Sequence, residues 1–228
     1  MATRVPAKHL TVDEVLAEFA SHETSEENAS NRRYEKGPRT DLSHVRDVAE
    51  QLGTHHDLAQ ELWATGDPHA RLVAILVSDP QRYTAEQLDA MLRDTRIPTV
   101  QDWLVEYILK SNPECEDLRI PWMADIDEDV AAAGWALTSH AVSEGVDNLD
   151  LKDLLDRIEE QVLLSSDRLQ WSMNECLAMI GIHSPKHRKK ALKIGERLGL
   201  YKDCPAMRNG TSPYAPAWIK ETLAWHKA

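Results

Sequence analysis

The feature that most constrains the fold is a run of helical segments separated by short breakers, which begins near Asp41. Segments of about 10 to 16 residues end at glycine or proline: Gly53, Gly66 to Pro68, Asp79-Pro80, Pro98, Pro113, Pro121, Gly145 and Pro185. Each carries apolar residues three, four and seven positions apart, for example Leu151, Leu154, Leu155 and Ile158. Because short connections make consecutive helices antiparallel, we expect an all-α fold of stacked helix pairs, an α-solenoid.

A weak internal repeat points the same way. Three stretches begin with an aspartate that we expect to cap a helix, at Asp67, Asp127 and Asp167, and continue into small and apolar residues. The last two lie about 40 residues apart, a spacing typical of HEAT-like units. The alternative is a helical bundle without repeats, because helix pairs of similar length can align by accident.

The N-terminal part is organised differently. Val15, Leu16 and Phe19 predict a helix from Thr11 to Phe19, with Thr11 as its N-cap. Residues 21–39 are polar and lack apolar periodicity, which predicts an exposed connection. We therefore predict an N-terminal helix and connection over residues 1–40, and a HEAT-like helical-repeat domain with a C-terminal extension over residues 41–228.

Charge is segregated along the chain. The formal net charge is −12, which argues against indiscriminate binding to phosphate. No acidic residue falls between Glu175 and Glu196, and this window holds Lys186, Arg188, Lys189, Lys190 and Lys193. We expect Ser184 to cap and Pro185 to begin a helix that presents these cations to phosphate. The alternative is an ordinary solvated helix face.

The sequence predicts no metal and no cofactor. Cys115, Cys176 and Cys204 lack the spacing of a zinc site, and we expect reduced, mostly buried thiols. His183 and His187 have no evident third ligand. Phosphate-loop, dinucleotide-binding and nucleophile-elbow motifs are not present.

Nothing in the sequence predicts a membrane partner. Residues 1–10 lack the apolar stretch of a secretory signal, and no run of about 18 apolar residues occurs. We expect a cytoplasmic monomer.

The seven tryptophans, beside a single phenylalanine, fill the bulky positions of this chain. Trp63, Trp122 and Trp135 lie among apolar neighbours, which predicts core anchors. Trp103 shares a helical face with polar groups, among them Glu106, Tyr107 and Lys110. Its ring could stack on a nucleobase or close a core.

Four stretches of the chain resemble a known family, the DNA alkylation repair proteins, also described as AlkD-like HEAT-repeat DNA glycosylases. These stretches are residues 58–74, 100–107, 121–135 and 172–181. The first joins the helix end at Trp63 to a helix with the pattern small-x-Ala-Arg-x-x-Ala, and residues 211–218 look like a C-terminal extension of some members. The resemblance implies an α-solenoid whose concave, positively charged face holds damaged duplex DNA and excises N-alkylated purines.

The resemblance also implies a catalytic set, from which this chain departs. The family pattern is a tryptophan followed four residues later by an aspartate, and here these positions are Trp103 and Tyr107. An arginine position aligns with Ala132 and a second tryptophan position with Glu175. A phenol is neutral at pH 7, so it cannot supply the carboxylate charge that stabilises the breaking glycosidic bond. The candidate replacement acids are Glu106 and Glu175.

These observations lead to one leading hypothesis and one rival. The first is a divergent DNA alkylation repair protein that binds duplex DNA or a lesion and is not expected to be a conventional alkylpurine glycosylase, because its hallmark catalytic positions are replaced. Its expected contacts are Trp103, Tyr107, Lys186, Arg188, Lys189, Lys190 and Lys193. The rival is a helical-repeat scaffold that binds a protein partner and no nucleic acid, which the net charge favours.

Overall fold

The described residues of this protein are helices joined by turns. The computed structural model describes residues 10–20, 42–207 and 210–225, and no strand occurs in these ranges. The all-α prediction is therefore confirmed. The predicted connection over residues 21–39 lies outside the described residues, and the predicted domain boundary at residue 40 stays a prediction.

The chain divides into two compact units, Met1–Pro113 (unit 1) and Glu114–Ala228 (unit 2). The division falls inside the segment that was predicted as one helical-repeat domain. Because it follows from internal packing, each unit has its own core.

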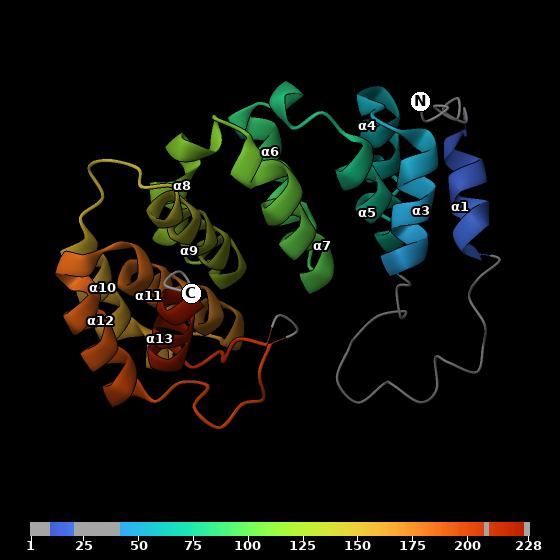
Figure 1. The fold of residues 1–228 in the computed structure, drawn as a ribbon. Coiled ribbons are helices and arrows are strands. Elements are labelled where there is room, and N and C mark those ends of the chain that lie inside the picture. Colours follow the sequence, from blue (N-terminus) through green and yellow to red (C-terminus); the bar gives the residue numbers. More distant parts are fainter. Residues whose placement is uncertain (1–9, 21–41, 208–209, 226–228) are drawn as a thin grey trace, which may run out of the picture. The chain divides into compact units, whose positions relative to one another are not determined.

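Unit 1 is built around one buried helix. Its elements are α1 (Val12–Ala20), α3 (Leu42–Leu52), α4 (His56–Ala64), α5 (Pro68–Val77), η1 (Pro80–Arg82), α6 (Ala85–Asp94), α7 (Pro98–Trp103), η2 (Leu104–Ile108) and η3 (Leu109–Ser111). Helix α5 packs against α1, α3, α4 and α7, and all its residues except Pro68 and Leu76 are buried. Figure 1 shows α3, α4 and α5 side by side.

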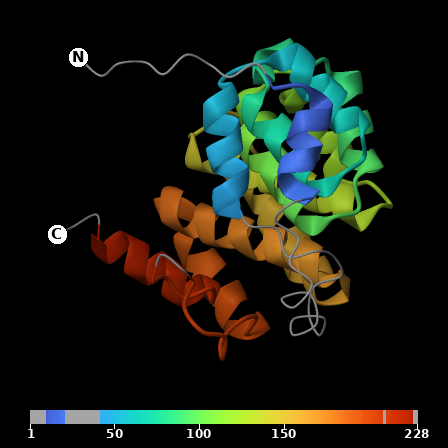
Figure 2. The same ribbon diagram turned by 90° about the vertical axis from the view of Figure 1, so that its right-hand side faces the viewer.

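Unit 2 is organised around the pair α9 and α11. Its elements are α8 (Cys115–Met123), α9 (Glu128–Ser143), α10 (Leu151–Gln161), η4 (Val162–Leu164), α11 (Asp167–His183), α12 (Pro185–Leu198) and α13 (Ala215–Trp225). Helix α11 contacts α9, α10, α12 and α13. Figure 2 shows α13, in red, beside the orange helices of this unit.

The predicted helix starts are largely confirmed. The backbone N–H of Glu14 donates to the Thr11 hydroxyl at 3.3 Å, and the Thr11 N–H donates to the Glu14 carboxylate at 2.8 Å. Asp67 accepts from the N–H of Ala70 at 2.9 Å, and Asp127 likewise caps α9. The prediction is wrong for Asp167, because Ser166 is the N-cap of α11 and Asp167 lies in its first turn.

Three glycines allow helices of unit 2 to approach closely. A Cβ at Gly134 would lie 2.5 Å from the backbone nitrogen of Met123, so α8 and α9 touch at the backbone. At Gly195 it would lie 2.8 Å from two ring carbons of Pro216, and at Gly181 it would overlap the tip of Ile219. Helix α13 therefore docks on α11 and α12 where these helices lack side chains.

The tryptophan predictions are mostly confirmed. Trp122 and Trp135 are among the largest fully buried side chains of the described residues. Trp63 departs from the prediction, since it is only half-buried; one face of its ring packs against the Arg71 guanidinium.

Candidate nucleic-acid interface

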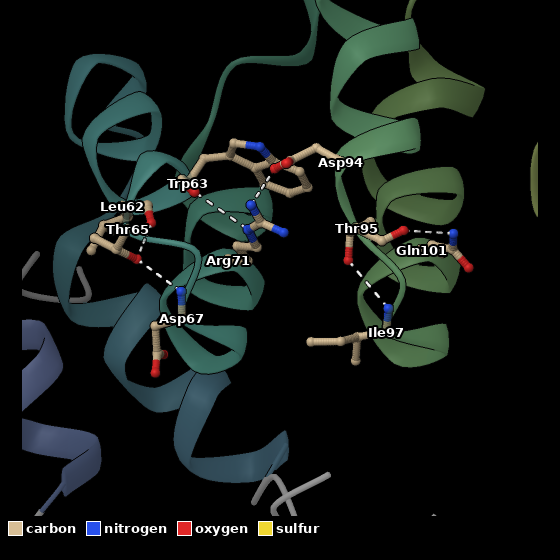
Figure 3. A network of polar contacts seen from close by, with 9 residues as sticks. All are labelled: Leu62, Trp63, Thr65, Asp67, Arg71, Asp94, Thr95, Ile97 and Gln101. Atoms are coloured by element: carbon tan, nitrogen blue, oxygen red, sulfur yellow. Dashed lines mark hydrogen bonds and ion pairs between the residues drawn. The ribbon is translucent and has the colours of Figure 1, made fainter. Parts of the chain in front are cut away.

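A buried arginine links three helices of unit 1 (Figure 3). The Arg71 guanidinium lies 4.8 Å from the centre of the Trp63 ring, and its Nε donates to the Trp63 carbonyl at 3.3 Å. Its Nη2 forms an ion pair with Asp94 at the end of α6. Arg71 thereby fixes the ends of α4 and α6 to α5.

The same network continues into α7. The Thr95 hydroxyl accepts from the N–H of Ile97 at 3.4 Å, and the Thr95 carbonyl accepts from Nε2 of Gln101 at 2.9 Å. Thr95 and Gln101 are both fully buried. Because Gln101 lies two residues before Trp103, these contacts set where α7 places that tryptophan.

Trp103 and Tyr107 form a ring pair, but the indole is the buried member. Trp103 is 8% exposed and Tyr107 is 37% exposed. Their ring centres lie 5.4 Å apart at 68°, and the Arg46 guanidinium covers the indole at 4.7 Å. Of the two alternatives for Trp103, the structure supports closure of a core. Its DNA contact stays a prediction.

The residues after Trp103 form a π-helical turn, η2, in which the N–H of Leu109 reaches back to the Leu104 carbonyl. Such turns are rare and frequently occur at functional sites. Here the turn presents the Tyr107 ring and the Glu106 carboxylate to solvent.

The two candidate acids lie in different units. Glu106 is exposed and pairs with Lys110 at 2.6 Å, one helical turn away. Glu175 is half-buried on α11. Ala132, at the position where the family pattern has an arginine, is buried in the core of unit 2.

The basic window separates into two groups of side chains. Arg188 donates to the carbonyls of Gly181 and Ile182 at 2.7 and 2.8 Å and so caps the end of α11. Lys190 pairs with Asp156 on α10. These two predicted phosphate contacts are therefore occupied within unit 2.

The other three cations form a lysine stripe, which we define as Lys186, Lys189 and Lys193. All three are exposed, and their spacing of three and four residues places them on one face of α12. None of them forms an ion pair with a residue that the structure describes.

Ser184 is the N-cap residue of α12 and Pro185 begins the helix, as predicted, but the Ser184 side chain makes no capping hydrogen bond. The Ser184 hydroxyl bonds to the ring of His187 at 2.9 Å and makes no bond to the backbone of the first turn.

Sequence reasoning missed an aromatic cluster on unit 2, which consists of Trp171, Tyr201 and Trp218. Trp171 is 36% exposed. Its ring centre lies 5.5 Å from that of Tyr201 at 73° and 6.4 Å from that of Trp218 at 34°. The available signal was the helical spacing, since Trp171 lies one turn before Glu175 on the same side of α11.

A hollow of about 490 Å³ opens elsewhere on unit 2, between the α8–α9 turn and η4. Its lining includes Ile126 and Leu164, which are 99% and 87% exposed. Asp125, Glu128 and Arg157 supply its charged groups. Arg157 is held there by the Met123 carbonyl, at 3.3 Å, and by the face of Trp135.

Comparison with known proteins identifies the family. Residues 15–219 match the family described as DNA alkylation repair enzyme. The chain belongs to this family. The match spans both units, so the predicted resemblance is confirmed.

One solved structure and one curated protein are similar to this family member. One solved structure, described as "a new family of proteins related to the HEAT-like repeat DNA glycosylases with affinity for branched DNA structures", has a TM-score of 0.72 and 20% identity, covering 95% of each chain. The HEAT-like α-solenoid class is therefore confirmed. The uncharacterized protein Lin0241 of Listeria innocua is 22% identical over 156 residues. The matched segment covers 66% of this chain and 66% of Lin0241, just under two thirds of that protein's length.

Among the residues that the structure describes, no three His, Cys, Asp or Glu side chains gather where a metal ion could bind. Within the same ranges, no helix combines the length and the apolar character needed to cross a bilayer.

Proposed function

We propose that this family member binds DNA with a preference for branched structures and does not excise alkylated bases by the carboxylate mechanism of the family. The observation that carries the proposal is the lysine stripe of α12. The family match and the branched-DNA affinity of the similar solved protein support it.

The lysine stripe has the dimensions of a phosphate contact. From Lys186 to Lys193 the helix rises about 10 Å, a length over which one DNA strand carries about three phosphates. The three side chains are exposed, whereas Arg188 and Lys190 are bound within the unit. We expect the stripe to supply the salt-dependent part of DNA affinity, and Arg188 to act by capping α11.

The catalytic positions support binding without excision. Tyr107 presents a phenol where the family pattern has a carboxylate. Ala132 is a buried methyl group at the arginine position, so it offers no cation to a ligand. Glu106, which is adjacent to Tyr107 in the sequence, forms an ion pair with Lys110 at 2.6 Å.

The binding test compares two triple variants of unit 2. The first replaces Lys186, Lys189 and Lys193 by alanine. Its matched control replaces Lys152, Arg197 and Lys220 by alanine, so that both variants lose the same formal charge. The three control side chains form ion pairs with Asp156, Glu159 and Glu196, respectively. Fluorescence anisotropy with a four-way junction and a duplex, at several salt concentrations, gives the affinity and its salt slope.

We expect the stripe variant to lose affinity and its slope of log K against log salt to fall by about 2.7, or 0.9 for each phosphate contact. The control variant keeps most of the DNA affinity and most of the salt slope. If the wild-type protein binds no DNA even at low ionic strength, the proposal is wrong.

A single-turnover assay tests the catalytic part. Methylated duplex is incubated with excess protein, and released 7-methylguanine and 3-methyladenine are measured. We expect no release above the protein-free rate. Release that disappears in Glu106→Gln or Glu175→Gln would show that another carboxylate has taken over the role of the aspartate.

The hollow beside Ile126 and Leu164 favours a second candidate function, a protein-binding scaffold. Large apolar side chains with this exposure beside a hollow are typical of interaction surfaces. The two candidates differ in an observable way, because a scaffold without nucleic-acid binding predicts no salt-dependent affinity for the four-way junction.

A further inference from the structure

Trp171 differs from the tryptophans in the core of unit 2. Trp122 and Trp135 are fully buried, whereas more than a third of the Trp171 surface is exposed. Its remaining contacts include two aromatic rings, those of Tyr201 and Trp218. An exposed indole supported by other rings can accept a further flat aromatic group.

The support for Trp171 is held in place by buried contacts. Asn174, one turn along α11, donates its Nδ2 to the Pro213 carbonyl at 3.0 Å and so fixes the segment that leads into α13. The contacts of Ile219 at Gly181 and of Pro216 at Gly195 fix α13 itself. Trp218 is therefore positioned by the packing of the residues beside it in α13, Pro216 and Ile219.

Tyr201 adopts an unusual backbone conformation. Its φ is 59°, and among the described residues only Asn148 shares a positive φ without being glycine. This conformation is disfavoured for a bulky side chain, and such strain clusters at functional sites. The turn is closed by the N–H of Cys204, which donates to the Tyr201 carbonyl at 3.2 Å.

The electrostatic surroundings favour a neutral ligand over a phosphate at the indole. Asp167 and Glu175 lie one helical turn on either side of Trp171. Burial and the Asp167 carboxylate raise the pKa of Tyr201, so its phenol stays protonated at neutral pH. A phosphate would be repelled here, whereas an uncharged ring would not be.

From this arrangement we infer that the aromatic cluster is a stacking site for an unpaired nucleobase. The inference rests on the proposed function and deepens it. The lysine stripe would hold the phosphates, since α12 ends at Leu198 and its chain leads directly into the turn of Tyr201. Branched DNA exposes unstacked bases at its branch point and a continuous duplex does not, so stacking on Trp171 gives a preference that phosphate contacts cannot.

The test uses three probes and a matched pair of tryptophan variants. The probes are a duplex, the same duplex with a single-stranded thymine flap, and the flap strand alone. The variants are Trp171→Ala and its control Trp225→Ala. Trp225 is also exposed, but it takes no part in the ring contacts of Trp171, Tyr201 and Trp218. Fluorescence anisotropy gives each affinity, and circular dichroism with urea denaturation checks folding.

We expect Trp171→Ala to weaken binding of the flap and the single strand by about 5- to 100-fold and to leave duplex affinity unchanged. Trp225→Ala leaves all three affinities unchanged. Trp171→Phe, which keeps a ring, retains part of the flap preference and covers the case in which the alanine variant is poorly folded.

Three results would overturn the inference. If both Trp171 variants fold and keep the full flap affinity while the lysine-stripe variant loses affinity, the stacking site is wrong and the proposed function stands. If Trp171→Ala weakens duplex and flap equally, the residue is structural. If the wild-type protein binds none of the probes at low salt, the proposed function fails together with the inference.

Discussion

Two tryptophan–tyrosine pairs, one in each unit, have almost the same geometry and opposite exposure. Trp103 and Tyr107 lie 5.4 Å apart at 68°, and Trp171 and Tyr201 lie 5.5 Å apart at 73°. In unit 1 the indole is buried and the phenol ring is exposed, whereas in unit 2 the indole is exposed and the tyrosine is half-buried.

The difference comes from what covers each indole. Arg46 of α3 lies over Trp103, and α7 is anchored beneath it by Gln101. Trp171 instead has two aromatic neighbours, Tyr201 and Trp218, and a surface that is partly open to solvent. The first pair therefore serves mainly stability, and the second keeps an indole available for a ligand.

The sharpest test of this comparison is the stability cost of removing each indole. We expect Trp103→Ala to lower the free energy of unfolding by about 3–5 kcal/mol, because a buried tryptophan leaves a cavity. Trp171→Ala should cost less, about 1–2 kcal/mol, since more than a third of its surface is already exposed. Urea denaturation of the full chain measures both. Equal losses would mean that the two sites do not differ.

The second prediction concerns the packing of α13 on Gly195, which supports the tryptophan–tyrosine pair of unit 2. Gly195→Ala should lower stability by about 1–2 kcal/mol, since overpacking against the rigid Pro216 ring outweighs the gain in helix propensity. Gly181→Ala is the control, because the tip of Ile219 can move aside, and its loss should be smaller. Thermal unfolding followed by circular dichroism gives the order. A stabilised Gly195→Ala protein would show that α13 adjusts freely.

The third prediction concerns Arg46, whose guanidinium covers the tryptophan of the unit 1 pair. Arg46→Ala removes the cation over Trp103 and should cost about 0.5–1 kcal/mol, with increased quenching of tryptophan fluorescence by acrylamide. Arg82→Ala is a suitable control, because Arg82 is exposed and pairs only with the exposed Asp57. If both variants show the same quenching, Arg46 does not shield the indole.

The smallest expected effect concerns the cysteines of unit 2. Burial raises the pKa of Cys115 and of Cys176 to about 12, so both remain protonated and unreactive between pH 7 and 9. Exposed Cys204, in the turn after Tyr201, should be alkylated in the native protein. Mass spectrometry of the labelled peptides measures this, and native labelling of Cys176 would contradict the burial of that core.

Much of the fold follows from local sequence patterns. Thr11, Asp67 and Asp127 lie at helix starts as their chemistry predicts, and Pro185 begins α12. Caps and breakers act within a few residues, so one sequence is enough to place them. The class of fold was predictable for the same reason, whereas the family followed from the resemblance of four stretches of the chain to the DNA alkylation repair proteins.

The candidate site was only partly predictable, because its decisive contacts join distant segments. Arg188 and Lys189 are neighbours in one basic run, yet only the folded path of α11 shows that Arg188 caps its carbonyls. Trp103 is covered by an arginine from a different helix. Trp171 is part of an aromatic cluster because Tyr201 and Trp218, which are distant in the sequence, lie beside it in the fold.

The backbone contact at Gly134 limits how this protein can change during evolution. A Cβ at that position would strike main-chain atoms of Trp122 and Met123, which cannot rotate away as the tip of a side chain can. Larger amino acids are thereby excluded while helices α8 and α9 cross at this point. Even between relatives that share only 20% of their residues, a glycine at this crossing should mark the register in which their sequences are aligned.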